Sequence, residues 1–135
     1  MFFYRKVNNL KLKEINLSIN FSENEWKYFK LFSNVFITKI ITNQTIILNY
    51  KRIRNYNYSN LSKDLSDNYT EVKYNENIFY HYFKNFIKEE ILQYEWLLIK
   101  DNFLITFTTT ISSKKSDNEI DEQYENVNNI LKQIN

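Results

Sequence analysis

Apolar and polar residues alternate along a short segment near the start of the chain. Between Lys13 and Phe21, one side carries Ile15, Leu17, Ile19 and Phe21 and the other carries Asn16, Ser18 and Asn20. A period of two residues predicts a half-buried β-strand. The next four residues, Ser22-Glu23-Asn24-Glu25, have the spacing of a capping box, so a short helix or turn carrying Trp26 and Phe29 is expected there.

Two segments rich in β-branched and aromatic residues come next. They span Val35–Thr42 and Thr45–Ile53 and are separated by Asn-Gln. Asn tolerates the left-handed backbone conformation that tight turns need, so the two segments predict a β-hairpin. The polar stretch Arg54–Tyr74 predicts a long irregular loop, with a short helix around Leu61–Leu65.

The segment Glu76–Leu92 shows a helical period instead. An apolar face would carry Ile78, Phe79, Tyr82, Phe83, Phe86 and Ile87, and the opposite face Lys84, Asn85, Lys88 and Glu89. With Asn75 as its cap, this pattern predicts an amphipathic helix that covers a sheet.

The remainder of the chain predicts a hairpin followed by a helix. Strands are expected at Tyr94–Ile99 and Phe103–Ile111, joined by a turn at Lys100–Asn102. A second capping-box pattern starts at Ser116 and opens a terminal helix. The apolar stripe of that helix consists of Ile120, Tyr124, Val127, Leu131 and Ile134.

This order of elements defines the expected architecture. Antiparallel hairpins mixed with covering helices are typical of the α+β class. The sequence therefore predicts a single α+β domain over residues 1–135, with a central antiparallel β-sheet covered by helices on its faces.

Composition removes several classes of function. The chain has no Cys, Gly or Pro. Without Cys there is no disulfide, thiolate metal ligand or thiol nucleophile. Without Gly, the close backbone approach to phosphate that Rossmann and P-loop sites use is excluded. The abundance of Lys, Asn, Ile, Tyr and Phe is typical of an AT-rich genome, so these counts say little about function.

Charge and hydropathy indicate the compartment and the class of partner. The formal net charge is +2, from 18 basic and 16 acidic residues, which is weaker than the basic signature of most nucleic-acid-binding domains. The chain opens on MFFYRKV without a signal-peptide pattern, and its apolar runs are too short to span a membrane. We therefore expect a cytoplasmic protein with no membrane partner, and nucleic acid is not the expected main partner.

Features at both ends of the chain resemble one known superfamily. They are a strand with Trp96, a polar turn, the strand Phe103–Ile111, and a terminal helix ending in Ile130, Leu131 and Ile134. The opening segment Ile15–Phe21 with Trp26 is similar as well, without the Pro that usually precedes that Trp. The pattern resembles the superfamily of the photosystem II extrinsic protein P, which includes the Ran-binding nuclear-import factor Mog and bacterial domains of unknown function.

This resemblance, which covers both ends of the chain, implies a fold and a broad role. The fold is a central antiparallel sheet with helices on both sides, an α/β/α sandwich. The role is protein binding, because members of the superfamily bind proteins or act as accessory subunits, and some bacterial relatives are chaperones or immunity proteins for secreted toxins. The resemblance carries over no functional residue, and fold likeness alone does not assign a function.

Residues able to do acid–base or metal chemistry are few. His81 is the single histidine, and the helical pattern makes it a solvent-facing residue. Carboxylates gather at Glu89-Glu90 and at the start of the terminal helix, where the helix dipole favours them: Asp117, Glu119, Asp121, Glu122 and Glu125. Metal sites and catalytic triads need more partners than one His, so we expect no catalytic residue, no metal and no cofactor. An enzyme would require an enclosed pocket holding His81, or buried carboxylates with shifted pKa values.

One segment, Tyr50–Tyr58, combines basic and aromatic residues. Its candidate binding residues are Lys51, Arg52, Arg54, Tyr56 and Tyr58. Tyr and Arg are favoured in protein interfaces, and they also stack on bases and contact phosphates in single-stranded nucleic acids. A strand end that runs into a loop explains the segment as well.

We therefore predict a non-enzymatic protein-binding module, of the bacterial accessory, chaperone or toxin-immunity type. The contact surface is expected in the loop Arg54–Tyr74 and the basic-aromatic segment that leads into it. The alternative is a weak single-stranded nucleic-acid-binding protein that uses residues 50–58, whose affinity would fall steeply with salt.

Overall fold

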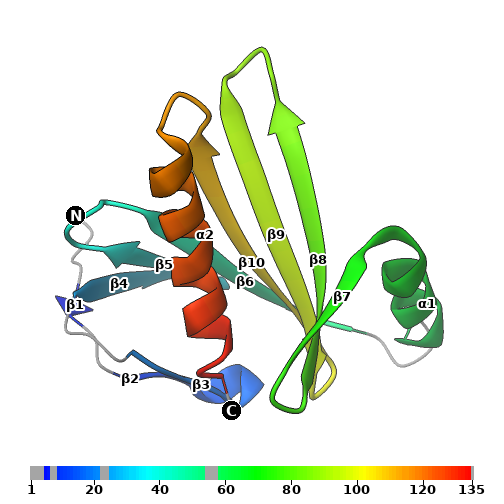
Figure 1. Cartoon of the computed structure of the whole chain (residues 1–135). Helices are drawn as coiled ribbons and strands as arrows, with labels where there is room; N and C mark the ends of the chain where they lie inside the picture. The colour runs from blue at the N-terminus through cyan, green and yellow to red at the C-terminus, as the bar shows by residue number, and fades with distance from the viewer. Residues whose placement is uncertain (1–4, 7–8, 22–24, 54–57, 135) are drawn as a thin grey trace.

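A computed structural model describes residues 5–6, 9–21, 25–53 and 58–134 of the chain (Figure 1). Within these residues the fold is mostly β, with ten strands, two α-helices and one 3-10 helix. The strands are β1 (Arg5–Lys6), β2 (Asn9–Leu12), β3 (Leu17–Asn20), β4 (Trp26–Leu31), β5 (Asn34–Lys39), β6 (Thr45–Arg52), β7 (Thr70–Tyr74), β8 (Asn77–Phe86), β9 (Ile91–Lys100) and β10 (Phe103–Ser112). The helices are η1 (Lys13–Ile15), α1 (Tyr58–Asn68) and α2 (Asp117–Leu131).

Eight of these strands form one antiparallel sheet in the order β1-β4-β5-β6-β10-β9-β8-β7, and β2 and β3 form a separate hairpin. The predicted hairpin at residues 35–53 is confirmed as β5 and β6, in which Phe36 pairs with Ile47. The predicted hairpin at residues 94–111 is confirmed as β9 and β10. Asp101 and Asn102 in its two-residue turn both have positive φ, at 50° and 67°, which defines a type I′ turn.

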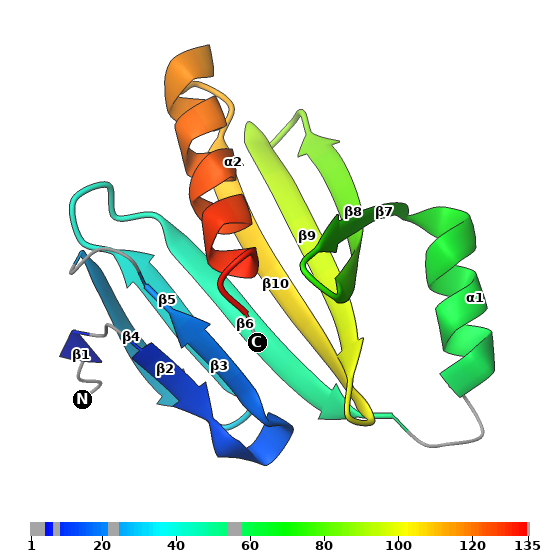
Figure 2. The same cartoon turned by 60° about the horizontal axis from the view of Figure 1, so that its bottom comes forward.

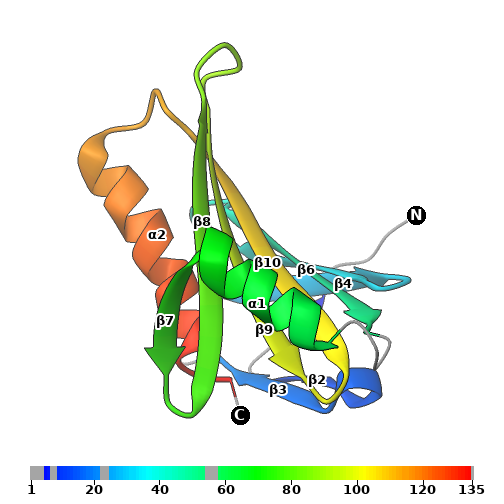
Figure 3. The ribbon, with the colours of Figure 1, turned by 90° about the vertical axis from the view of Figure 1, so that its right-hand side faces the viewer.

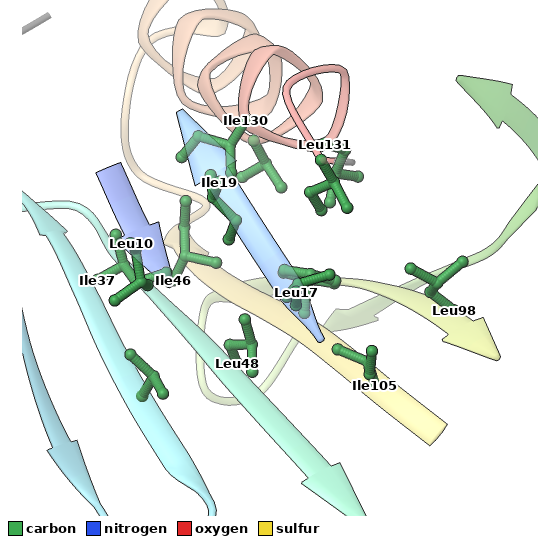
Figure 4. Close-up of a cluster of buried hydrophobic side chains, with 14 of the residues drawn as sticks. Leu10, Leu17, Ile19, Ile37, Ile46, Leu48, Leu98, Ile105, Ile130 and Leu131 are labelled. Carbon is green, nitrogen blue, oxygen red and sulfur yellow. The ribbon is translucent and has the colours of Figure 1, made fainter. Parts of the chain in front are cut away.

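The hydrophobic core lies on one face of the large sheet. We call this the inner face, because α2 and the β2–β3 hairpin cover it (Figures 1 and 2). Figure 4 shows Ile19 of β3 and Leu131 of α2 in one cluster with Leu48 and Ile105 of the sheet. All four side chains are fully buried, so this layer closes the core along the inner face.

The terminal helix begins where the sequence predicts it. The Ser116 side-chain oxygen accepts a hydrogen bond from the backbone N–H of Glu119 at 3.2 Å, which is the capping interaction. Val127 and Leu131 of the predicted stripe are fully buried. The helix start capped by Ser116 is therefore confirmed, and so is the buried stripe as far as Leu131, whereas Ile134 of the predicted stripe lies beyond the end of α2.

Among the described residues, the opposite, outer face is covered at one end only. There α1 packs Leu61 and Leu65 against a small cluster that includes Tyr80 and Leu97 (Figure 3). Farther along the face, Ile47 and Tyr82 remain 37% and 38% exposed. The predicted sheet with helices covering its faces, an α/β/α sandwich, is therefore wrong: the described chain is mostly β, because segments expected to be helical are strands.

The largest difference lies in the predicted helix Glu76–Leu92, which is wrong. The segment forms β8, a turn and the start of β9, and β8 pairs with β9 continuously from Phe79 opposite Leu98 to Phe86 opposite Ile91. Aromatic and β-branched residues favour strands when they pack across a sheet. This pairing outweighs the helical spacing of the same residues.

Three shorter predicted segments also differ from the structure. Trp26 begins strand β4 instead of lying in a short helix, and residues 22–24 of the first capping box are outside the described residues. The predicted strand Lys13–Phe21 is split into η1 and β3 by Asn16, which has a φ of 52°. The predicted loop Arg54–Tyr74 contains α1 and β7, so the helix expected around Leu61–Leu65 is confirmed and is longer than expected.

None of the helices in the described ranges is long and apolar enough to cross a membrane.

Candidate functional site

The predicted basic-aromatic segment is only partly placed by the structure. Lys51 and Arg52 end β6 and are exposed, but as neighbours on one strand they point to opposite faces of the sheet. The Arg52 guanidinium lies 5.5 Å from the Phe103 ring centre on the adjacent strand. Arg54 and Tyr56 are outside the described residues, and so is the side chain of Tyr58, which begins α1. Of the five predicted residues, two are therefore seen, and they do not share a surface.

His81 lies in β8 and not on a solvent-facing helix, so that expectation is wrong. Its ring stacks on Trp96 of β9 with centroids 4.4 Å apart. Its Nδ1 is 2.9 Å from the backbone oxygen of Glu95, and since a carbonyl only accepts, Nδ1 carries the proton. Burial lowers the pKa of His81, against the smaller opposing effect of that hydrogen bond. His81 is therefore a neutral packing residue at pH 7.

An aromatic cluster surrounds His81 on the inner face. Tyr124 of α2 lies 5.6 Å from Trp96 and 5.1 Å from Tyr94 between ring centroids, and Phe83 lies 4.9 Å from Tyr94. Trp96 is fully buried, and its indole N–H finds no hydrogen-bond acceptor in the part of the chain that the structure describes. Exposure increases across the cluster from this buried ring to Phe83, which is 47% exposed.

Glu95 lies on the outer face, directly opposite Tyr82 of β8. Partial burial raises its pKa, because the charged carboxylate is poorly solvated there. The nearby Tyr69 ring packs edge-on against Tyr82 at 5.4 Å, and burial, followed by the charge of Glu95, raises the pKa of Tyr69. His81 and Glu95 thus have shifted pKa values on opposite faces, and they form no acid–base pair.

These two groups predict opposite pH effects on stability. His81 binds protons less readily when folded, so the fold loses stability as the pH falls from the ordinary value of 6.5 toward the lowered pKa. Glu95 binds protons more readily when folded, so the fold loses stability as the pH rises from 4.5 toward the raised pKa. Melting temperatures between about pH 4 and pH 8 should show both changes. The variant His81→Phe should remove only the loss of stability as the pH falls below 6.5, and Glu95→Gln only the loss as the pH rises above 4.5. Unchanged pH profiles in these variants would contradict the assignments.

The hairpin of β8 and β9 projects beyond the rest of the sheet (Figures 1 and 3). Its turn, residues 87–90, contains Glu90 in the left-handed region at a φ of 57°. Two contacts hold Glu90: its backbone oxygen accepts a hydrogen bond from Ser113 at 2.9 Å, and its carboxylate pairs with Lys114 at 2.9 Å. Ile87, at the start of the turn, is 79% exposed, and Ile91, the first residue of β9, is 36% exposed. The tip therefore presents apolar side chains on a fixed support.

One edge of this hairpin is open. The edge strand β7 pairs with β8 only as far as Thr70 opposite His81. In the described part of the chain, no strand pairs with Tyr82–Phe86 on that side. These five residues of β8, which include the exposed Phe83, therefore form a free sheet edge within the described chain.

A separate cavity of about 410 Å³ lies where the β2–β3 hairpin meets the end of β9. It is lined by Lys11, Leu12, Lys13, Asn16, Leu17, Ser18 and Lys100. Three of these residues are Lys and none is acidic, so the charge of the lining favours an anion. Within the described ranges, no group of three or more His, Asp or Glu side chains is placed to hold a metal ion.

Sequence reasoning missed the β8–β9 hairpin as a candidate surface. The error follows from the predicted helix, which placed Phe83 and Ile87 on a buried stripe. One signal was available: Lys88, Glu89 and Glu90 separate two aromatic-rich stretches, and a polar interruption of that kind is also typical of a turn.

Comparison with known proteins supports the fold and no more. No protein-family model matches the chain, and no curated protein matches it. A crystal structure of a protein from Bacteroides thetaiotaomicron, at 1.50 Å resolution, is similar with a TM-score of 0.63 and 12% sequence identity. The similarity covers 97% of this chain and 48% of that one, so this chain spans about half the length of its structural neighbour. The resemblance to the extrinsic protein P superfamily stays a prediction.

Proposed function

We propose that this chain is a non-enzymatic protein-binding module and that the β8–β9 hairpin is its contact surface. The observation that carries the proposal is the gathering of exposed apolar side chains on one projecting feature (Figure 1). Ile87 at the tip is 79% exposed, Phe83 on the inner face is 47% exposed and Ile91 on the outer face is 36% exposed, so the hairpin offers apolar side chains at its tip and on both of its faces. Single exposed apolar residues are ordinary on protein surfaces, whereas a group of them marks an interaction site.

The charges around these residues favour a protein over a nucleic acid. At the tip, Lys84 and Lys88 are accompanied by Glu89 and Glu90. A nucleic-acid surface is dominated by positive charge that neutralises phosphates. An apolar and aromatic centre with a rim of mixed charge is the usual anatomy of a protein–protein interface.

The earlier candidate surface has less support. Lys51 and Arg52 point to opposite faces, so they cannot together track one phosphate backbone. The accessory, chaperone or immunity role and the cytoplasmic location stay predictions of the sequence. The proposed contact surface depends on neither.

Matched variants in a partner capture test this proposal. The tagged chain is used to capture partners from a lysate of its native cells, with and without nuclease, as wild type, Ile87→Ser and Ile41→Ser. Ile41, in the β5–β6 loop, is 72% exposed, so the two variants make the same change at similarly exposed sites. We expect one stoichiometric, nuclease-resistant protein partner that Ile41→Ser retains and Ile87→Ser binds about 30-fold more weakly, the effect of losing an interface hot spot. Equal capture by both variants, or capture that nuclease abolishes, would contradict the proposal.

A further inference from the structure

The register of the β9–β10 turn determines toward which neighbouring strand each backbone N–H and C=O group of β8 points. In a type I′ hairpin the pair that flanks the two-residue turn, here Lys100 and Phe103, exchanges backbone hydrogen bonds. Alternate residues of an antiparallel strand bond to opposite neighbours. Counting back along β9, Glu95 and Gln93 therefore bond to β8, where their partners are Tyr82 and Lys84.

The residues between these partners face the other way. Phe83 and Asn85 direct their backbone N–H and C=O groups away from β9, toward the side that β7 leaves open. In the described ranges, the pairing of β7 ends at His81, two residues earlier. A row of unpaired backbone donors and acceptors is a template for another strand.

We propose that Tyr82–Phe86 binds an extended segment of a partner protein by β-strand addition. This inference rests on the proposed function and specifies how the same hairpin makes its contact. The unpaired groups of Phe83 and Asn85 require an extended backbone, since neither a helix nor a loop offers donors and acceptors at strand spacing.

The side chains beside the edge define the chemistry of the incoming segment. On the inner face, Phe83 packs on Tyr94 and leaves 47% of its surface exposed, which favours an apolar side chain opposite it. Lys84 is on the outer face, where its ammonium lies 4.8 Å from the Phe86 ring centre. No carboxylate among the described residues pairs with Lys84, so an acidic side chain is favoured there. The segment is thus extended, apolar at alternate positions and acidic opposite Lys84.

A second copy of this chain is a poor occupant of the whole five-residue edge. Antiparallel pairing of Tyr82–Phe86 with itself about its middle residue places Lys84 directly opposite the same residue of the other copy. Like charges directly opposite each other destabilise a strand pair, and an edge Lys is a common safeguard against self-association. A different protein that carries the acidic residue avoids this repulsion.

The test uses synthetic peptides and two variants at one position. The peptides carry fluorescein and alternate Val with Thr, and each peptide of the series replaces a different Thr with Glu. Matched control peptides have Lys in place of that Glu. Binding of each peptide to the full chain is measured by fluorescence anisotropy. Asn85→Pro removes an N–H that points to the open side and spares the pairing with β9, whereas Asn85→Ala keeps the N–H. Asn85 is exposed, so neither change empties the core.

We expect a Glu peptide to bind wild type and Asn85→Ala alike, and to bind Asn85→Pro at least about tenfold more weakly, with the Lys peptides weaker than their Glu counterparts. No binding to wild type, or equal binding by the two variants, would overturn strand addition. Should the Pro variant unfold, amide exchange in the wild type decides: protection of Phe83 and Asn85 by bound peptide supports the proposal, and unchanged exchange overturns it. A captured partner that Ile87→Ser loses but a folded Asn85→Pro variant keeps would support the hairpin as the contact surface and contradict strand addition alone.

Discussion

Replacing Trp96 with Ala is expected to lower the free energy of unfolding by about 3–5 kcal/mol. Trp96 is fully buried where β8, β9 and α2 meet, and its ring stacks on His81 and lies 5.6 Å from Tyr124. Truncation removes the ring contacts and leaves a cavity that a packed core cannot close fully. Because a domain is stable by only about 5–15 kcal/mol, urea unfolding should show a large fall in the midpoint.

The variant Trp96→Phe separates the packing of the ring from its N–H group. Phe keeps an aromatic ring beside His81 and removes the indole N–H, which has no acceptor among the described residues. An unpaired buried donor costs free energy, so its removal offsets part of the lost packing. We expect a clearly smaller loss than for Ala. An equal loss in the two variants would contradict the role given to the ring.

Replacing Leu131 with Ala is expected to cost about 2–5 kcal/mol, because α2 and β3 close the same core there. Leu131 is fully buried, and Ile134, just beyond the helix, bridges to Ile19 of β3. Asn129→Ala is the matched control, because Asn129 is exposed on the same helix, and such a change should stay within about 0.5 kcal/mol. Similar changes in the free energy of unfolding for both variants, measured by urea unfolding, would contradict the role given to the burial of Leu131.

The C-terminal part of the fold could be predicted from the sequence because its signals are local. A turn with two residues able to adopt positive φ, Asp101 and Asn102, lies between two β-rich segments. Ser116 and the apolar stripe after it specify a capped helix, and the structure has both. In these elements the local pattern and the tertiary packing agree.

The segment at β8 could not be predicted in the same way, because its residues satisfy two patterns. Phe79, Tyr82, Phe83 and Phe86 have helical spacing, yet the same residues pair with β9 along an unbroken register. Pairing with a distant strand is not visible in a local window, and here it decides the conformation. The polar residues of the turn were its one signal, because Glu90 occupies a left-handed position that Gly or Asn usually fills.

The candidate site was missed for the same reason. A segment predicted as a buried helix stripe offers no surface, so the sequence favoured the basic and aromatic residues around Lys51 and Arg52 instead. The free edge that includes Phe83 depends on where β7 stops pairing with β8. That end point is the first residue of β7, Thr70, which follows closely on the end of α1 at Asn68.

Residue-resolved amide hydrogen exchange along β8 in the free protein tests the open edge most directly. An open edge predicts alternation: the N–H groups of Tyr82 and Lys84, which bond to β9, exchange slowly, and those of Phe83 and Asn85 exchange rapidly. Uniform protection from Tyr82 to Phe86 would contradict it, because it would mean that another segment already covers the edge or that the residues are helical.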